Sequence, residues 1–230
     1  MTSVFQSNRP ITAVGGGDVG SEDLNLALSV APTCIAADGG SIVALAAGIQ
    51  LEAVIGDFDS LNSAVLAQVP VEQQYHIAEQ NSTDFDKCLR NVETPVVVGV
   101  GFLGGRVDHQ MAAMHTLVVR ADRPCVLLGP HEVVFHCPAE IELPTRVGDI
   151  VSLFPMAEVT GTAVGLEWPI DGLALAPGER VGTSNRATGV IQLKMSARGM
   201  LCILPRRMLA DVTQALAAMP DHVKWPARVK

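Results

Sequence analysis

The stretch Ala53-Val54-Ile55-Gly56-Asp57-Phe58-Asp59-Ser60 joins a short apolar run to two carboxylates. The apolar run predicts a buried strand, and Gly56 allows the chain to turn out of it. In extended backbone, Asp57 and Asp59 would point to one face about 6.5 Å apart and Phe58 to the other, because each residue rises roughly 3.3 Å. Two carboxylates at the carboxyl end of a strand suit the binding of Mg²⁺ that carries a phosphate. Taken alone, such residues more often form a simple turn without a metal.

A second acidic cluster, Thr83-Asp84-Phe85-Asp86-Lys87, opens a predicted helix. Apolar side chains recur at helical spacing from residue 85 to residue 92, and Thr83 and Asp86 have the spacing of a capping box. Helical residues two apart are rotated by about 200°, so Asp84 and Asp86 cannot both face one ligand. We expect Asp84 to belong to the site and Asp86 to be structural.

A glycine-rich loop follows the strand predicted over residues 11–14. The loop Gly15-Gly16-Gly17-Asp18-Val19-Gly20 has the spacing G-x-G-x-x-G, and Asp38 ends the next predicted strand. This arrangement imitates a dinucleotide-binding fingerprint. A tight strand-to-helix turn without a ligand explains the same residues equally well.

A second glycine loop follows the strand predicted over residues 96–100. It contains Gly101, Gly104 and Gly105 and leads through Arg106 into a predicted helix. Phosphate recognition needs this combination of close backbone approach, free backbone N–H donors and a positively charged guanidinium group that donates two hydrogen bonds. A simple loop ion pair between Arg106 and Asp108 is the alternative.

Four predicted strands of the first half therefore end in loops rich in glycine or aspartate. Carboxyl ends of parallel strands meet at one edge of a sheet, so these loops should share a site. From residue 131 to 205 the apolar runs are short and punctuated by glycine and proline, which indicates a sandwich or barrel. The sequence predicts an α/β fold with a Rossmann-like, mostly parallel sheet domain (1–129), an all-β sandwich domain (130–205) and a C-terminal helical tail (206–230).

The composition excludes several classes of protein. Hydrophobic residues make up 48% of the chain and charged residues 17%, which indicates a compact folded protein. A net charge of −8 argues against a general binder of nucleic acids or anionic membranes. Neither an apolar leader nor a run of about 20 apolar residues is present, so we expect a cytoplasmic protein. Five scattered cysteines without a C-x-x-C pair predict reduced, buried thiols.

Six motifs together resemble the thiamine pyrophosphokinase family, also called thiamine diphosphokinases, and they occur in the family's order across residues 11 to about 205. The motifs are Ala37-Asp38-Gly39-Gly40, Ile55-Gly56-Asp57-Phe58-Asp59-Ser60, Gln80 with Thr83-Asp84-Phe85, Gly104-Gly105-Arg106-Val107-Asp108, Gly148-Asp149-Ile150-Val151-Ser152-Leu153-Phe154-Pro155 and Thr183-Ser184-Asn185.

This resemblance implies a homodimer with a shared active site that transfers the diphosphate of ATP to the hydroxyl of thiamine, giving thiamine diphosphate and AMP. It implies Mg²⁺ held by Asp57, Asp59 and Asp84, with Arg106 and Asp108 completing the catalytic set. The implied nucleotide-binding residues are Asp38, Gly39, Gly40, Gln80, Thr83, Gly104 and Gly105. Ser184 and Asn185 are the implied contribution of the second domain to thiamine binding.

Thiamine is a flat, cationic heteroaromatic molecule, which favours aromatic stacking and nearby carboxylates. Trp168 lies sixteen residues before Ser184 and is our candidate for this contact. Ordinary packing of Trp168 in a β-domain core is an equally good interpretation.

Two other functions compete with this one. An NAD(P)-dependent oxidoreductase would explain the glycines of residues 15–20 and Asp38, but it leaves the carboxylates at 57, 59 and 84 without a role. A non-catalytic nucleotide-binding module is disfavoured because every position of the predicted metal site remains acidic.

Overall fold

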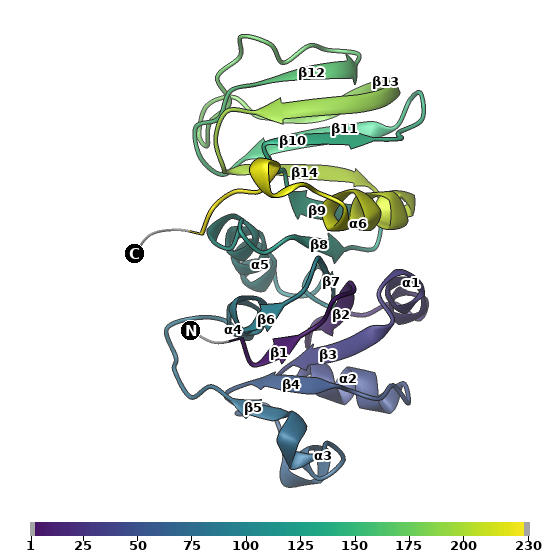
Figure 1. Cartoon of the computed structure of the whole chain (residues 1–230), viewed down its shortest axis with the longest axis vertical. Helices are drawn as coiled ribbons and strands as arrows, with labels where there is room; N and C mark the ends of the chain where they lie inside the picture. Colours follow the sequence, from purple (N-terminus) through teal and green to yellow (C-terminus); the bar gives the residue numbers. More distant parts are fainter. Residues whose placement is uncertain (1–2, 228–230) are drawn as a thin grey trace.

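A 12-stranded mixed sheet runs through the computed structural model, which describes residues 3–227 (Figure 1). The sheet order is β10-β13-β11-β14-β9-β8-β7-β2-β3-β4-β5, and β12 pairs with β13 beside this path. A separate two-stranded sheet joins β1 (Phe5–Gln6) to β6 (Val92–Glu93). The chain is therefore a mixed α/β protein.

The half of the sheet from β8 to β5 is parallel throughout. Four of its strands are buried along their whole length, as expected for a parallel sheet covered on both faces. The strands are β2 (Ile11–Val14), β3 (Thr33–Ala37), β4 (Ala53–Gly56), β5 (Gln74–His76), β7 (Val97–Val100) and β8 (Cys125–Leu128).

Helices cover both faces of this parallel half. Apolar side chains of α1, α2 and α6 join one core cluster, and those of α4 and α5 join a second cluster on the opposite face. The helices are α1 (Asp23–Val30), α2 (Gly40–Ala46), α3 (Ser63–Leu66), α4 (Asp84–Asn91), α5 (Val107–Val119) and α6 (Leu209–Ala217), with 3₁₀ turns η1 (Val71–Gln73), η2 (Arg206–Met208) and η3 (Asp221–Val223).

The other half of the sheet is antiparallel. Its longest strand, β13, pairs with β11 through its first residues and with β10 and β12 through its later ones. The strands are β9 (Glu132–His136), β10 (Glu140–Leu143), β11 (Ile150–Pro155), β12 (Gly161–Leu166), β13 (Gly182–Met195) and β14 (Met200–Pro205).

The two halves are parts of one continuous sheet. The expected boundary at residues 129 and 130 falls in the turn between β8 and β9, which pair antiparallel with Val126 opposite Phe135. Figure 1 shows this stack passing from β7 through β8 and β9 to β14. The shorter apolar runs after residue 130 therefore mark a change from parallel to antiparallel strand pairing, within one sheet.

Three further features of the fold concern the C-terminal helix, the short strand β5 and the lengths of the helices. Helix α6 buries Leu209, Val212 and Leu216, which confirms a packing helix in the tail. Between residues 69 and 77 the chain forms the turn η1 and then the short strand β5. No helix within residues 3–227 is both long and apolar enough to cross a membrane.

All five cysteines are free and buried, as the sequence predicts. Burial raises the pKa of the Cys34, Cys88 and Cys137 thiols to about 12. A thiol with so high a pKa is almost entirely protonated at neutral pH and is a poor nucleophile.

Gly40 allows α2 to start directly against the end of β2. A Cβ added there would lie 1.9 Å from the carbonyl oxygen of Val14, so Gly40→Ala forces the helix away from the sheet. We expect a loss of about 1–3 kcal/mol in the free energy of unfolding, measured with urea. Gly16→Ala is the control, because its nearest neighbour would be 3.5 Å away. Equal stability of the two variants would contradict this account.

Candidate active site

A cavity of about 580 Å³ lies at the carboxyl edge of the parallel strands. Its volume is in the range of pockets that hold small molecules and cofactors. Its walls come from the loops after β2, β3, β4 and β7 and from the starts of α2, α4 and α5. The lining includes Gly15, Gly16, Gly17, Asp38, Gly39, Ser60, Thr83, Asp84, Phe85, Gly101, Gly104, Gly105, Arg106 and His109.

Two glycine loops meet at this cavity where the order of strands reverses direction, between β2 and β7. The backbone N–H of Gly17 donates to the carbonyl of Gly101 at 3.0 Å. Gly101, Gly104 and Gly105 all have left-handed backbone, with φ of 76°, 90° and 70°. A switch point with exposed backbone is where open α/β sheets bind ligands, so the expected gathering of these loops at one edge is confirmed.

Asp38, Asp57 and Asp59 form an acidic cluster beside the cavity. One carboxylate oxygen from each lies within 4.8 Å of the others. Asp38 is only 1% exposed, and neither of its carboxylate oxygens has a hydrogen-bond partner among the described residues. A buried carboxylate without a partner is costly unless a cation balances it. An all-oxygen donor set suits a hard cation, so these residues fit Mg²⁺.

The backbone between Asp57 and Asp59 is not extended, so that expectation was wrong. Phe58 has φ of 63°, a left-handed conformation that is uncommon for an aromatic residue. The Phe58 ring lies 5.4 Å from the ring of His76, and His76 Nε2 hydrogen-bonds the carbonyl of Asp57 at 3.0 Å. These contacts hold a turn in which an oxygen of each of the two carboxylates lies within 4.8 Å of the other.

Lys87 lies beneath the acidic loops and is only 1% exposed. Its Nζ donates to Asp57 Oδ2 and, at 3.1 Å, to Asp84 Oδ1. The hydrogen bond from Lys87 holds the pKa of Asp57 below its usual value, whereas burial raises the pKa of Asp84. Sequence reasoning gave Lys87 no role, although its position three residues after Asp84 on a helix was a usable signal.

Asp84 and Asp86 point in different directions, as helical geometry predicts. Asp86 accepts hydrogen bonds from Arg120 Nε at 2.7 Å and Nη2 at 2.9 Å, and a longer one from Arg90. The Thr83 hydroxyl accepts the N–H of Asp86 at 3.2 Å, which confirms the predicted cap. Asp86 is therefore structural, and Asp84 lines the cavity.

The loop before α4 is fastened to the same helix. Arg90 Nη2 donates to Glu79 Oε1 at 2.6 Å, and the Ser82 hydroxyl donates to the same oxygen. From this loop Gln80 Nε2 reaches Asp57 Oδ2 at 3.1 Å. Gln80, predicted to bind nucleotide, therefore also contacts the acidic cluster.

Arg106 and Asp108 form a two-point ion pair, with 3.1 Å from Nε to Oδ1 and 2.6 Å from Nη2 to Oδ2. Their side chains are 71% and 64% exposed. Arg106 holds the pKa of Asp108 below its usual value. The loop ion pair weighed from the sequence is thus present, and it lies at the mouth of the cavity, which Arg106 lines.

Ser184, Asn185 and Trp168 gather at another place. Asn185 Nδ2 donates to the Trp168 carbonyl at 2.7 Å, and Asn185 Oδ1 accepts the Trp168 N–H at 3.1 Å. The Trp168 side chain is 52% exposed, so it is not ordinary core. The described lining of the cavity comes from residues 15–113, so this trio lies outside it.

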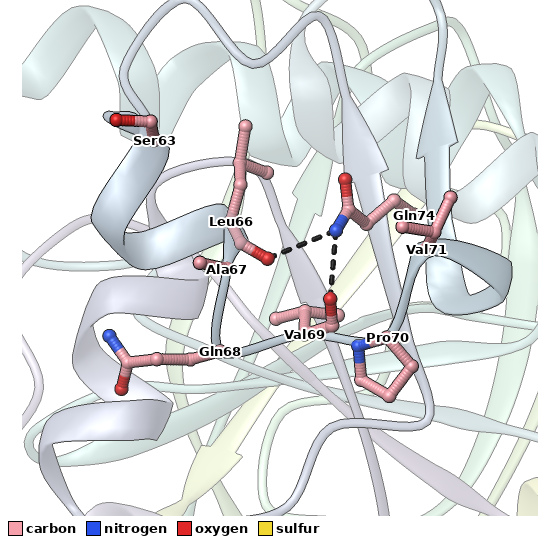
Figure 2. A pocket seen from close by; sticks show the side chains of 8 residues that line it. All are labelled: Ser63, Leu66, Ala67, Gln68, Val69, Pro70, Val71 and Gln74. Carbon is pink, nitrogen blue, oxygen red and sulfur yellow. Dashed lines mark hydrogen bonds between the residues drawn. The ribbon is translucent and has the colours of Figure 1, made fainter.

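A second hollow, of about 530 Å³, adjoins α3. Figure 2 shows Gln74 Nε2 bridging the carbonyls of Leu66 and Val69, at 3.0 and 2.8 Å. The eight residues drawn there include no ionisable side chain. This hollow offers no acid, base or charged ligand for chemistry.

Two family models match the chain. "Thiamin pyrophosphokinase, catalytic domain" matches residues 24–127, and "Thiamin pyrophosphokinase, vitamin B1 binding domain" matches residues 138–197. The chain belongs to the thiamin pyrophosphokinase family. The catalytic-domain match contains the acidic cluster and most of the cavity lining.

Related sequences agree with this membership. Thiamin pyrophosphokinase 1 of Caenorhabditis elegans is 28% identical over 153 residues, which are 59% of this chain and 62% of the relative. Thiamine pyrophosphokinase 2 of Oryza sativa subsp. japonica is 30% identical over 154 residues, 58% of this chain and 57% of the relative. The match thus spans about three fifths of these thiamin pyrophosphokinases.

Solved structures share the fold. Thiamine pyrophosphokinase from Bacillus subtilis aligns with a TM-score of 0.68 and 21% identity over 86% of this chain and 98% of the other. The Candida albicans thiamin pyrophosphokinase aligns with a TM-score of 0.71 and 13% identity, covering 89% and 93%. None of these likenesses supports an NAD(P)-dependent oxidoreductase.

The Glu79 contacts make a prediction about pH. Hydrogen bonds from Ser82 and Arg90 lower the pKa of Glu79 from 4.5 to about 2. A carboxyl group whose pKa is lowered by folding stabilises the fold above its unfolded pKa, and that contribution disappears as the pH falls through the folded pKa. Wild type should therefore melt at a higher temperature than Glu79→Gln at pH 7. The gap should narrow as the pH falls from about 4.5 toward about 2.

The control for this experiment is Glu72→Gln, at an exposed position on η1. Its melting temperature should follow that of wild type at each pH. A gap between wild type and Glu79→Gln that stays constant from pH 7 to pH 3 would contradict the assignment.

Proposed function

We propose that this protein is a thiamine diphosphokinase that transfers the diphosphate of ATP to the hydroxyl of thiamine and releases AMP. The observation that carries the proposal is a buried Asp38, without a hydrogen-bond partner among residues 3–227, grouped with Asp57 and Asp59 beside a glycine-lined cavity. The match of both family models in one chain supports the same activity.

ATP would lie in the cavity with its phosphates against the two glycine loops. Backbone N–H groups and the start of a helix favour anions, and Gly104 and Gly105 leave room for close approach. Asp38, Gly39, Gly40, Gln80 and Thr83 complete the proposed nucleotide site. All of these except Gly40 and Gln80 line the cavity, and Gln80 is joined to it through Asp57.

Mg²⁺ would be held by Asp57, Asp59 and Asp84, and the grouping of Asp38 with the first two adds it to this set. Bound there, the ion would neutralise the phosphates and polarise their oxygens. The chain's other charges have separate tasks. Lys87 balances Asp57 and Asp84 from below, and Arg106 offers a cation at the mouth of the cavity.

Arg106 would turn from Asp108 to the transferred group. The guanidinium is exposed and already makes a two-point contact with a carboxylate, so exchange for a phosphate oxygen pair preserves its geometry. Negative charge on the phosphoryl oxygens grows during attack at the β-phosphorus, and the guanidinium group of Arg106 would stabilise that charge. Asp108 would then be free to orient the loop and the incoming hydroxyl.

Thiamine would bind mainly through the half formed by residues 130–205, proposed as a β-sandwich domain beside the nucleotide-binding domain of residues 1–129. Asn185 is hydrogen-bonded to the backbone of the exposed Trp168 there, and Ser184 is the neighbour of Asn185 on β13. Because they do not line the cavity of their own chain, we propose a homodimer in which each active site takes this group from the other subunit. Within the proposed C-terminal tail (206–230), helix α6 buries Leu209, Val212 and Leu216, and we assign this helix a packing role.

A cytoplasmic location completes the proposal. All five cysteines are free, which fits a reducing compartment.

The activity has a direct test. Purified protein should convert thiamine and ATP to thiamine diphosphate and AMP only when a divalent cation is present, with the products separated by ion-exchange chromatography. Asp59→Asn should lower turnover by about 10²-fold or more, because an exposed carboxylate is lost without disturbing the core. ADP as the sole nucleotide product would overturn the proposal, since it means single phosphoryl transfer.

The shared site can be tested by mixing inactive variants. Asp59→Asn protein and Ser184→Ala/Asn185→Ala protein are refolded together, so that half of the dimers contain one chain of each kind. Such a dimer keeps one intact site, and activity should return to about a quarter of wild type. Mixing Asp59→Asn with Asp57→Asn is the control and should restore nothing. No recovery in demonstrated heterodimers would place thiamine within one chain.

A further inference from the structure

Lys87 is a fully buried lysine whose ammonium group is paired with two carboxylates. It is 1% exposed and heads the largest fully buried side chains of the described residues. Burying an ammonium group is unfavourable unless carboxylates pair with it and take up its hydrogen bonds. Asp57 and Asp84 do so here, one from the loop after β4 and one from the start of α4.

The contacts of Lys87 fall on one particular oxygen of each carboxylate. Asp57 Oδ2 accepts from Lys87 Nζ and also, at 3.1 Å, from Gln80 Nε2. Among residues 3–227, the hydrogen bond that Asp57 Oδ1 accepts is a long backbone one, 3.3 Å from the N–H of Asp59. In Asp84 the Lys87 bond falls on Oδ1. Each carboxylate therefore keeps one oxygen with little or no competition.

The second observation concerns the acidic cluster to which Asp57 belongs and which lies beside the cavity that Asp84 lines. Asp38 is buried with both oxygens unpartnered among residues 3–227, and it groups with Asp57 and Asp59 within 4.8 Å. A carboxylate in that condition points to a cation as its missing partner. The acidic cluster is therefore a ligand site, and Lys87 borders it without being one of its ligands.

We propose that Lys87 is a positioning residue that restricts Asp57 and Asp84 to one ligating oxygen each and thereby makes the cluster select Mg²⁺ over Ca²⁺. Mg²⁺ takes about six ligands in a tight octahedron, usually one oxygen per carboxylate, whereas Ca²⁺ accepts up to about eight and readily uses both oxygens of a carboxylate. A clamp on the second oxygens withholds the extra ligands that Ca²⁺ would use. This inference rests on the proposed function only in assigning a divalent cation to the cluster.

The test measures metal binding directly and needs no turnover. The full chain is titrated with Mn²⁺, free Mn²⁺ is followed by electron paramagnetic resonance, and Mg²⁺ and Ca²⁺ are used as competitors. Lys87→Met keeps the length of the side chain and removes its hydrogen bonds. We expect the Mg²⁺-to-Ca²⁺ affinity ratio to move toward Ca²⁺ by about tenfold or more, the size typical of lost partners around metal ligands.

Lys194→Met is the matched control, since Lys194 pairs with Glu140 at an exposed position on β13. Its ratio should equal that of wild type. A folded Lys87→Met protein with an unchanged ratio would overturn the proposal. So would an equal loss of affinity for both ions, because a merely structural role predicts that outcome.

Loss of the buried ammonium can also prevent folding, so a second variant is included. Lys87→Met/Asp84→Asn removes one charge of each sign and leaves Asp57 Oδ2 with the neutral Gln80 amide as its donor. Its ratio should also move toward Ca²⁺. Wild type alone gives a third criterion, because tighter binding of Ca²⁺ than of Mg²⁺ would refute the proposal whatever the variants do. An inactive wild type with the expected ratios would refute only the diphosphokinase proposal.

Discussion

The ion pair between Lys87 and Asp57 is the contact on which the arrangement of the site depends. It joins the loop after β4 to α4, two elements thirty residues apart. Asp38, Asp57, Asp59 and Asp84 repel one another, and the repulsion is strongest at the buried Asp38, where the medium is less polarisable than water. One buried ammonium offsets part of it and leaves a net negative site. The fold thus holds the carboxylates ready for a cation without fully neutralising them.

Most of the parallel half was predictable because its signals are local. Short, largely buried apolar runs followed by glycine or aspartate define β2, β3, β4 and β7. The continuity of the sheet was not predictable, since the pairing of β8 with β9 depends on register across a turn. The pattern of apolar residues shows whether the faces of a strand are buried. It says much less about which strand pairs with it.

The site was predicted in composition but not in detail. Asp57 and Asp59 do converge, yet through a left-handed Phe58 whose turn is held by His76, eighteen residues away. Asp38 lies in the acidic cluster, and Lys87 lies under it, because of contacts made only after folding. The spacing of Lys87 from Asp84 is a local signal, but the contacts with Asp57 and Asp38 join different strands and helices, so no spacing in the sequence encodes them.

Backbone strain links the two places where functional residues gather. Within residues 3–227, the non-glycine residues with left-handed φ are Asp38, Phe58 and Ser184. Each such conformation costs about 1–3 kcal/mol and persists only where surrounding contacts impose it, often at functional sites. Two of the three belong to the acidic loops. Ser184 lies far along the chain, with its N–H held by the Ser152 hydroxyl at 2.9 Å. A fold that maintains this strain outside its own cavity has a reason to do so if Ser184 completes a cavity in another copy.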